Sequence, residues 1–104
     1  MSTLVVKLLG DMPLESIALT GDDTGALAAV ISGLDSSRYP YLAFVDPFGT
    51  TTFNGSQMRV VIPELLRLRK EEVAAPVRAV IGQALDVARR CQDGVHLYLQ
   101  FEGD

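Results

Sequence analysis

The chain of 104 residues is long enough to bury one hydrophobic core and too short for two, so we expect a single domain spanning residues 1–104. Hydrophobic residues make up 48% of the chain and charged residues 21%, a balance that excludes disordered, collagen-like and disulfide-scaffold proteins. The formal net charge of −4 argues against nucleic acid as a partner, because a phosphate backbone would be repelled.

The charge is unevenly distributed along the chain. Residues 1–56 carry net −4, residues 57–92 carry net +3 from seven bases and four acids, and the last twelve residues carry net −3. The basic segment has almost no aromatic residues that could stack on bases, and its charges are spaced like the outer faces of helices. We therefore interpret it as solvated helix surface.

Two strands are expected at the start of the chain. Residues 3–10 (TLVVKLLG) are apolar and rich in β-branched side chains, and Gly10 with the residues after it ends the run. Residues 14–19 follow across a turn and can pair with the first strand as a second, shorter one.

The first helix is predicted by apolar residues that recur at helical spacing and share one face: Leu27, Val30, Ile31 and Leu34. Thr20 or Asp22 is the expected N-cap, since either side chain can accept a backbone N–H. Gly33 ends the helix.

A β-hairpin is predicted next. Residues 41–45 are aromatic, aliphatic and β-branched, and residues 50–53 (TTTF) are again β-prone. Between them, residues 46–49 (DPFG) have the composition of a type I turn, with Asp at the first position, Pro at the second and Gly at the last.

Two further helices are indicated by helical spacing of apolar residues over residues 54–70 and 72–92. Asn54 or Ser56 is available as N-cap of the earlier one. Pro63 lies inside it, so we expect either a kink or a restart at that point.

The final strand shows the clearest alternation in the sequence, with apolar residues at Val95, Leu97, Leu99 and Phe101. The resulting order is β(β)αββααβ. This order predicts an α+β fold: a small, mostly antiparallel sheet of 4-5 strands with three helices packed on one face.

The sequence contains none of the common catalytic or phosphate-binding motifs. Its one histidine and one cysteine allow no metal cluster, and Cys91 continues the inward stripe of a helix, as an inert buried thiol would. We therefore predict no catalytic residue, no metal and no cofactor. An alternative is a metal or acid–base site formed by carboxylates at strand ends: Asp11, Asp46, Glu102 and Asp104.

A contact surface for a partner is expected on the polar side of the sheet. If the apolar residues of the final strand face the helices, the residues between them face outward, beside Tyr41, Ala43 and Val45 or beside Lys7. Aromatic and mixed-polar surfaces of this kind are typical of interfaces, and Phe48 at the hairpin tip adds an exposed ring. The predicted partner-binding residues are Phe48, Tyr41, His96, Tyr98 and Gln100.

These features favour a small acidic protein-interaction domain without catalytic activity, such as an adaptor or an inhibitor of a more basic protein. One alternative is a small-ligand or metal-dependent enzyme domain that uses the strand-end carboxylates. Another is a homodimeric structural domain. We expect a cytoplasmic protein without a membrane partner, because a single cysteine forms no internal disulfide and the first ten residues resemble no signal peptide.

Overall fold

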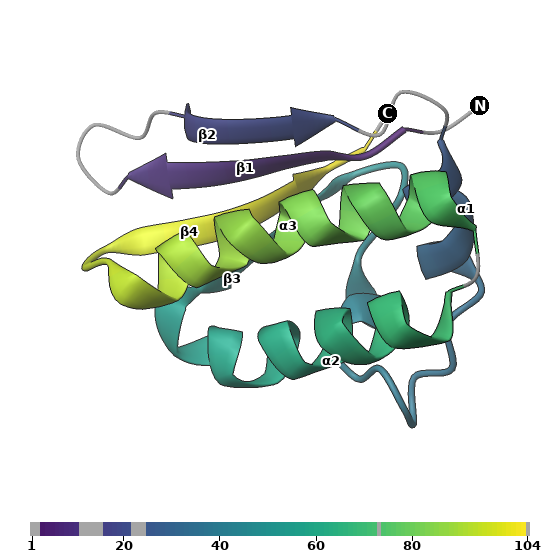
Figure 1. Cartoon of the computed structure of the whole chain (residues 1–104). Coiled ribbons are helices and arrows are strands. Elements are labelled where there is room, and N and C mark those ends of the chain that lie inside the picture. Colours follow the sequence, from purple (N-terminus) through teal and green to yellow (C-terminus); the bar gives the residue numbers. More distant parts are fainter. Residues whose placement is uncertain (1–2, 11–15, 22–24, 73, 104) are drawn as a thin grey trace.

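The chain forms an antiparallel sheet with helices packed against one side, as the computed structural model shows (Figure 1). The structure describes residues 3–10, 16–21, 25–72 and 74–103. The elements in chain order are β1 (Val5–Gly10), β2 (Ser16–Gly21), α1 (Ala26–Ser32), the 3-10 turn η1 (Leu42–Phe44), β3 (Thr50–Asn54), the 3-10 turn η2 (Gly55–Gln57), α2 (Met58–Glu71), α3 (Ala75–Asp93) and β4 (Leu97–Glu102).

The sheet has the order β2-β1-β4-β3, and every neighbouring pair of strands is antiparallel. Alternate residues of β4 point into the core, where Leu99 and Phe101 are fully buried. Val6 and Leu8 of β1 lie beside them on the same face. The predicted α+β class, with an antiparallel sheet and three helices, is confirmed.

Helix α3 lies across the sheet, and α2 packs beside α3 (Figure 1). The inward stripe of α3 is buried as predicted, including Ile81, Ala84 and Leu85. Helix α2 continues through Pro63 without a restart. The turn η2, which leads directly into α2, starts with a capping box, in which the Asn54 side chain accepts from the Gln57 amide and the Gln57 side chain accepts from the Asn54 amide.

The predicted hairpin is wrong in its first half. Residues 41–45 do not form a strand; the chain instead makes the short turn η1, and β3 pairs with β4. The order observed in the described residues is therefore ββαβααβ, with one strand fewer at this point than predicted. The physical reason lies in α2, where a buried carboxylate accepts the backbone N–H groups that a neighbouring strand would otherwise bind.

Two predicted element starts are also corrected. Thr20 belongs to β2 and Asp22 lies outside the described residues, so the N-cap of α1 is Gly25, whose φ of 74° suits glycine. At the other end of the chain, β4 begins at Leu97. Val95 therefore does not join the core and has 79% of its surface exposed.

Candidate functional site

Tyr98 and Gln100 alternate with the buried Leu99 and Phe101 and therefore lie on the sheet face that points away from the helices, as the alternation predicted. In the register, Gln100 pairs with Lys7 on β1 and with Thr52 on β3, and its Nε2 donates to the Thr52 Oγ1 at 3.2 Å. The Lys7 ammonium forms an ion pair with Glu102 at 3.0 Å. Val5, opposite Glu102, and Leu9, opposite Tyr98, lie on the same face, so it mixes polar side chains with half-buried apolar ones and the half-buried ring of Tyr98.

His96 occupies the turn before β4, so its predicted place on a strand is wrong. Its φ of 58° places its backbone in the left-handed region, which few residues other than glycine adopt readily. His96 and Tyr98 together border a small cavity of about 270 Å³, which is also lined by Asn54, Gly55, Ser56, Gly94 and Leu97.

Tyr41 does not join Tyr98 and Gln100. Its ring stacks on the ring of Phe53, with centroids 5.8 Å apart and planes 3° from parallel, and Phe53 belongs to the core. Val45, expected beside it on the outer face, is buried. These placements follow from the replacement of the predicted strand by η1, which keeps Leu42 in the core but buries Val45 and exposes Phe44.

Phe44 and Phe48 are the most exposed aromatic side chains among the described residues, at 78% and 72%. The chain's other two phenylalanines, Phe53 and Phe101, are buried. Exposure of Phe48 was expected from its position in a turn. Phe44 was missed because a strand over residues 41–45 would have turned its ring toward the core.

The segment that carries Phe48 is held by its own polar groups. The Asp46 Oδ1 accepts from the Phe48 amide at 2.9 Å, and the Thr51 hydroxyl accepts from the Asp46 amide at 3.0 Å. The Gly103 amide donates to the Gly49 carbonyl at 2.7 Å. A Cβ at residue 103 would meet the carbonyl oxygen of Pro47, so glycine is needed for this close approach.

The strand-end carboxylates that lie in the described residues have local partners. The Asp46 carboxylate accepts the Phe48 amide in its own turn, and the Glu102 carboxylate pairs with Lys7. Asp11 and Asp104 lie outside the described residues. Within the described part of the chain, no group of three or more His, Cys, Asp or Glu side chains could hold a metal ion. Cys91 is buried, and this burial raises the pKa of its thiol.

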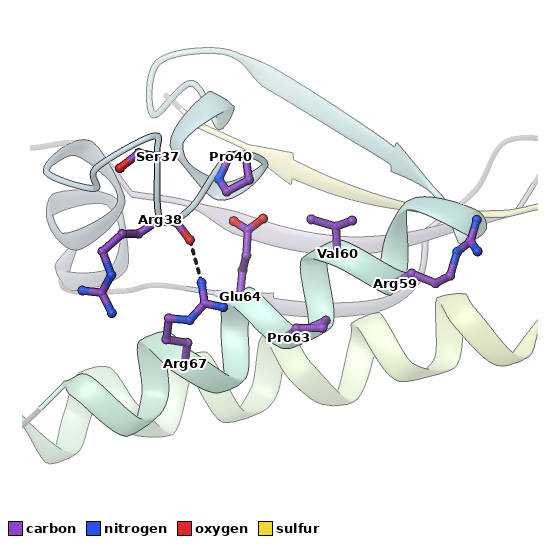
Figure 2. A pocket seen from close by; sticks show the side chains of 8 residues that line it. All are labelled: Ser37, Arg38, Pro40, Arg59, Val60, Pro63, Glu64 and Arg67. Atoms are coloured by element: carbon purple, nitrogen blue, oxygen red, sulfur yellow. Dashed lines mark hydrogen bonds between the residues drawn. The ribbon is translucent and has the colours of Figure 1, made fainter.

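A cleft of about 530 Å³ lies between α2 and the loop that precedes η1; we call it the arginine cleft (Figure 2). Its lining consists of Ser37, Arg38, Pro40, Arg59, Val60, Pro63, Glu64 and Arg67. Arg59, Pro63 and Arg67 are spaced four positions apart on α2 and therefore share one side of the helix.

Glu64 anchors the loop to α2. Its side chain is buried, and its two oxygens accept from the backbone amides of Tyr41 at 3.1 Å and Leu42 at 2.9 Å. The Arg67 Nη1 adds a hydrogen bond of 2.6 Å to the Arg38 carbonyl, drawn in Figure 2. Two successive turns of α2 thus hold the loop at both of its sides, at Arg38 and at Tyr41 and Leu42.

Tyr39 and Arg38 converge on Glu71 at the end of α2. The Tyr39 hydroxyl donates to one oxygen of Glu71, and the Arg38 Nη2 donates to the other at 2.6 Å. These hydrogen bonds hold the pKa of Glu71 below its ordinary value. Burial, together with the bond to Glu71, raises the pKa of Tyr39 to about 12.

Sequence reasoning missed the arginine cleft, although two signals were present. The arginines of α2 recur at helical spacing, and we interpreted them as solvated surface. Glu64 falls among the apolar positions Val61, Leu65 and Leu68, an unusual place for an acid that has no partner. The loop residues that complete the cleft carry no periodic pattern that would have placed them against α2.

Comparison with protein-family models, with curated proteins and with solved structures finds no match. Within the described residues, no helix combines the length and the apolar character that a membrane span requires.

Proposed function

We propose that the chain is a small protein-interaction domain without catalytic activity, and that Phe44 and Phe48 are the centre of its contact surface. The observation that carries this proposal is the exposure of both rings, 78% and 72%, in a chain whose other phenylalanines are in the core. A buried aromatic side chain contributes more to a protein interface than most other residues, while two exposed ones weaken solubility without benefit to the fold.

The backbone around both rings supports this role. Phe44 is the last residue of η1, and the next amide, that of Val45, donates back to the Leu42 carbonyl at 3.1 Å. Phe48 lies in a turn in which its own amide donates to the Asp46 carboxylate. Rings presented on a hydrogen-bonded backbone lose little conformational entropy when a partner covers them. The sheet face that carries Tyr98 and Gln100 would add polar contacts at the rim of such an interface.

Two forms of the proposal differ in the partner. In the first, the partner is a different protein and the chain acts as an adaptor or inhibitor. In the second, the partner is a second copy of the chain, and the aromatic pair lies at a homodimer interface. The same substitutions test both, because either partner must cover the two rings.

The test combines the double variant Phe44→Ala/Phe48→Ala with Val95→Ala, a control whose exposed apolar side chain, at 79%, is not part of the proposed surface. We expect the double variant to keep the parent melting temperature, since neither ring is buried. Sedimentation equilibrium measures self-association, and affinity capture on immobilised full chain measures a different partner. Loss of association in the double variant and retention in Val95→Ala supports the proposal. Equal association in all three chains contradicts it.

A further inference from the structure

The arginine cleft has positive charge at both ends and apolar residues between them (Figure 2). Arg59 and Arg67 are eight positions apart on α2, which corresponds to about 12 Å along a helix axis. Arg38 joins Arg67 at one end, since both guanidinium groups lie over the Tyr39 ring, at 5.7 and 5.6 Å from its centroid. Two cationic centres are therefore separated by a short stretch that holds the apolar residues Val60 and Pro63 and the buried Glu64.

The charge of the cleft is opposite to that of the chain. Three arginines and one acid line it, whereas the whole chain carries net −4. The acid, Glu64, directs both oxygens to backbone amides. Within the described part of the chain, the side chain of Arg59 has neither a hydrogen bond nor an ion pair. Arg38 is paired with Glu71, whereas Arg59 and Arg67 form no ion pair among the described residues. An approaching anion would thus meet two guanidinium groups, those of Arg59 and Arg67, that no carboxylate neutralises.

Arg38 and Arg67, at the end of the cleft near Tyr39, are already held in position by hydrogen bonds. Arg67 donates to the Arg38 carbonyl, and Arg38 donates to Glu71, each at 2.6 Å. Each of these bonds uses one nitrogen of a guanidinium group that carries five N–H donors, so further donors face the solvent. A carboxylate bound here would cost less side-chain entropy than one bound by two unrestrained arginines.

The cleft is open along its length, which favours an extended chain over a small molecule. Of its lining residues, only Glu64 is buried and Val60 half-buried, and the others are exposed. A small ligand usually needs most of its surface covered, whereas an extended peptide binds with one side. At about 3.3 Å per residue, the separation of about 12 Å corresponds to about four peptide residues.

We propose that the arginine cleft binds an acidic peptide segment in extended form, with carboxylates about four residues apart that contact Arg59 at one end and the Arg38–Arg67 pair at the other. Pro40, Val60 and Pro63 would pack against the apolar part of the segment. Nucleic acid fits less well, because the residues that line the cleft include no aromatic side chain that could stack on bases. The chain as a whole is also acidic and would repel a phosphate backbone. This site is separate from Phe44 and Phe48, so it does not depend on the aromatic contact surface.

The test uses a synthetic peptide with two glutamates four residues apart in a glycine and serine background, titrated into the isotope-labelled full chain at low ionic strength. We expect shifts of backbone amide signals in residues 37–41 and 59–67. Arg59→Gln and Arg67→Gln should each weaken binding about two- to fivefold, the effect of one exposed ion pair. Arg89→Gln is the matched control, since it removes the same charge from an exposed position on α3 and should leave binding unchanged.

Several outcomes would overturn the proposal. One is equal binding of a peptide in which both glutamates are replaced by glutamine. Another is an equal loss of binding in Arg89→Gln, which would indicate attraction by net charge alone. Tighter binding of a single-stranded oligonucleotide with the same shifted signals would replace the acidic peptide by nucleic acid as the ligand. Melting temperatures of the three variants equal to that of the parent chain show that folding is not the cause of a loss.

Discussion

Strand β4 and the loop of residues 35–49 are held in place by different forces. β4 pairs with a strand on each side and buries Leu99 and Phe101, so backbone hydrogen bonds and apolar burial fix it. The loop forms no strand before β3 and depends on side-chain acceptors, chiefly Glu64 and Glu71 of α2. The regular element needs only a repeated pattern, whereas the loop needs particular residues at particular distances along the chain.

The two largest expected effects come from removing the loop's main anchor and from opening the core under β4. Glu64→Leu leaves the amides of Tyr41 and Leu42 without acceptors, and each such amide costs about 1–3 kcal/mol when it stays buried. We expect the free energy of unfolding to fall by about 2–4 kcal/mol, measured by urea denaturation. Glu64→Gln keeps one acceptor oxygen and should lose about half as much.

Leu99→Ala provides the comparison in β4. It should lose a similar amount, about 2–5 kcal/mol, because it opens a cavity in the core. Hydrogen exchange separates the two variants: Glu64→Leu should speed exchange in residues 39–45 selectively, and Leu99→Ala should speed it throughout the sheet. If Glu64→Leu is as stable as the parent chain, the loop is held by other contacts than those described.

The same difference explains how much of the fold the sequence predicts. Alternation in β4 and helical spacing in α3 are local patterns, and the buried face of each was predicted correctly from Leu97 onward in β4 and along α3, although Val95 lies outside the strand. Residues 41–45 have equally strong β propensity, yet form η1 because Glu64, some 22 positions further along the chain, supplies acceptors to the backbone. Propensity describes a residue's own preference and carries no information about such a distant partner.

The candidate surfaces follow the same rule. Tyr98 and Gln100 were placed on the outer face by alternation, and Phe48 was placed in a turn by its Asp, Pro and Gly neighbours. Phe44 and the arginine cleft could not be placed, because both depend on how the loop meets α2. Exposed side chains outside a periodic element are therefore the least predictable part of this chain.

An intermediate effect is expected at the turn that starts β4. His96 has a φ of 58°, a conformation that costs a residue with a Cβ about 1–2 kcal/mol relative to glycine. His96→Ala and His96→Gly both remove the imidazole, so their difference isolates the backbone. We expect the glycine variant to be more stable by about 1 kcal/mol in thermal or urea denaturation. Equal stabilities would show that β4 does not depend on this conformation.

The last effect appears only in alkali and concerns the contact between Tyr39 and Glu71. The pKa of Tyr39 is raised from 10.0 to about 12 in the folded chain, so folding favours the protonated hydroxyl. The stability that this provides is fully present below pH 10 and is lost as the pH rises through 12. We expect the free energy of unfolding of the parent chain to fall over this range, and that of Tyr39→Phe to lack this fall.

Tyr98→Phe is the matched control, because it removes a hydroxyl from β4 and leaves the loop unchanged. It should keep the alkaline fall of the parent chain, since Tyr39 is still present. The acid side gives an independent check: Glu71 has a lowered pKa, so its stabilisation is present above its ordinary value of 4.5 and is lost as the pH falls below it. Tyr39→Phe removes the larger of the two hydrogen-bond contributions to that lowering and should reduce the acid loss. If Tyr39→Phe shows the same loss of stability as the parent chain in both alkali and acid, the polar contacts of the loop with α2 do not control its stability. The contrast with β4 then fails.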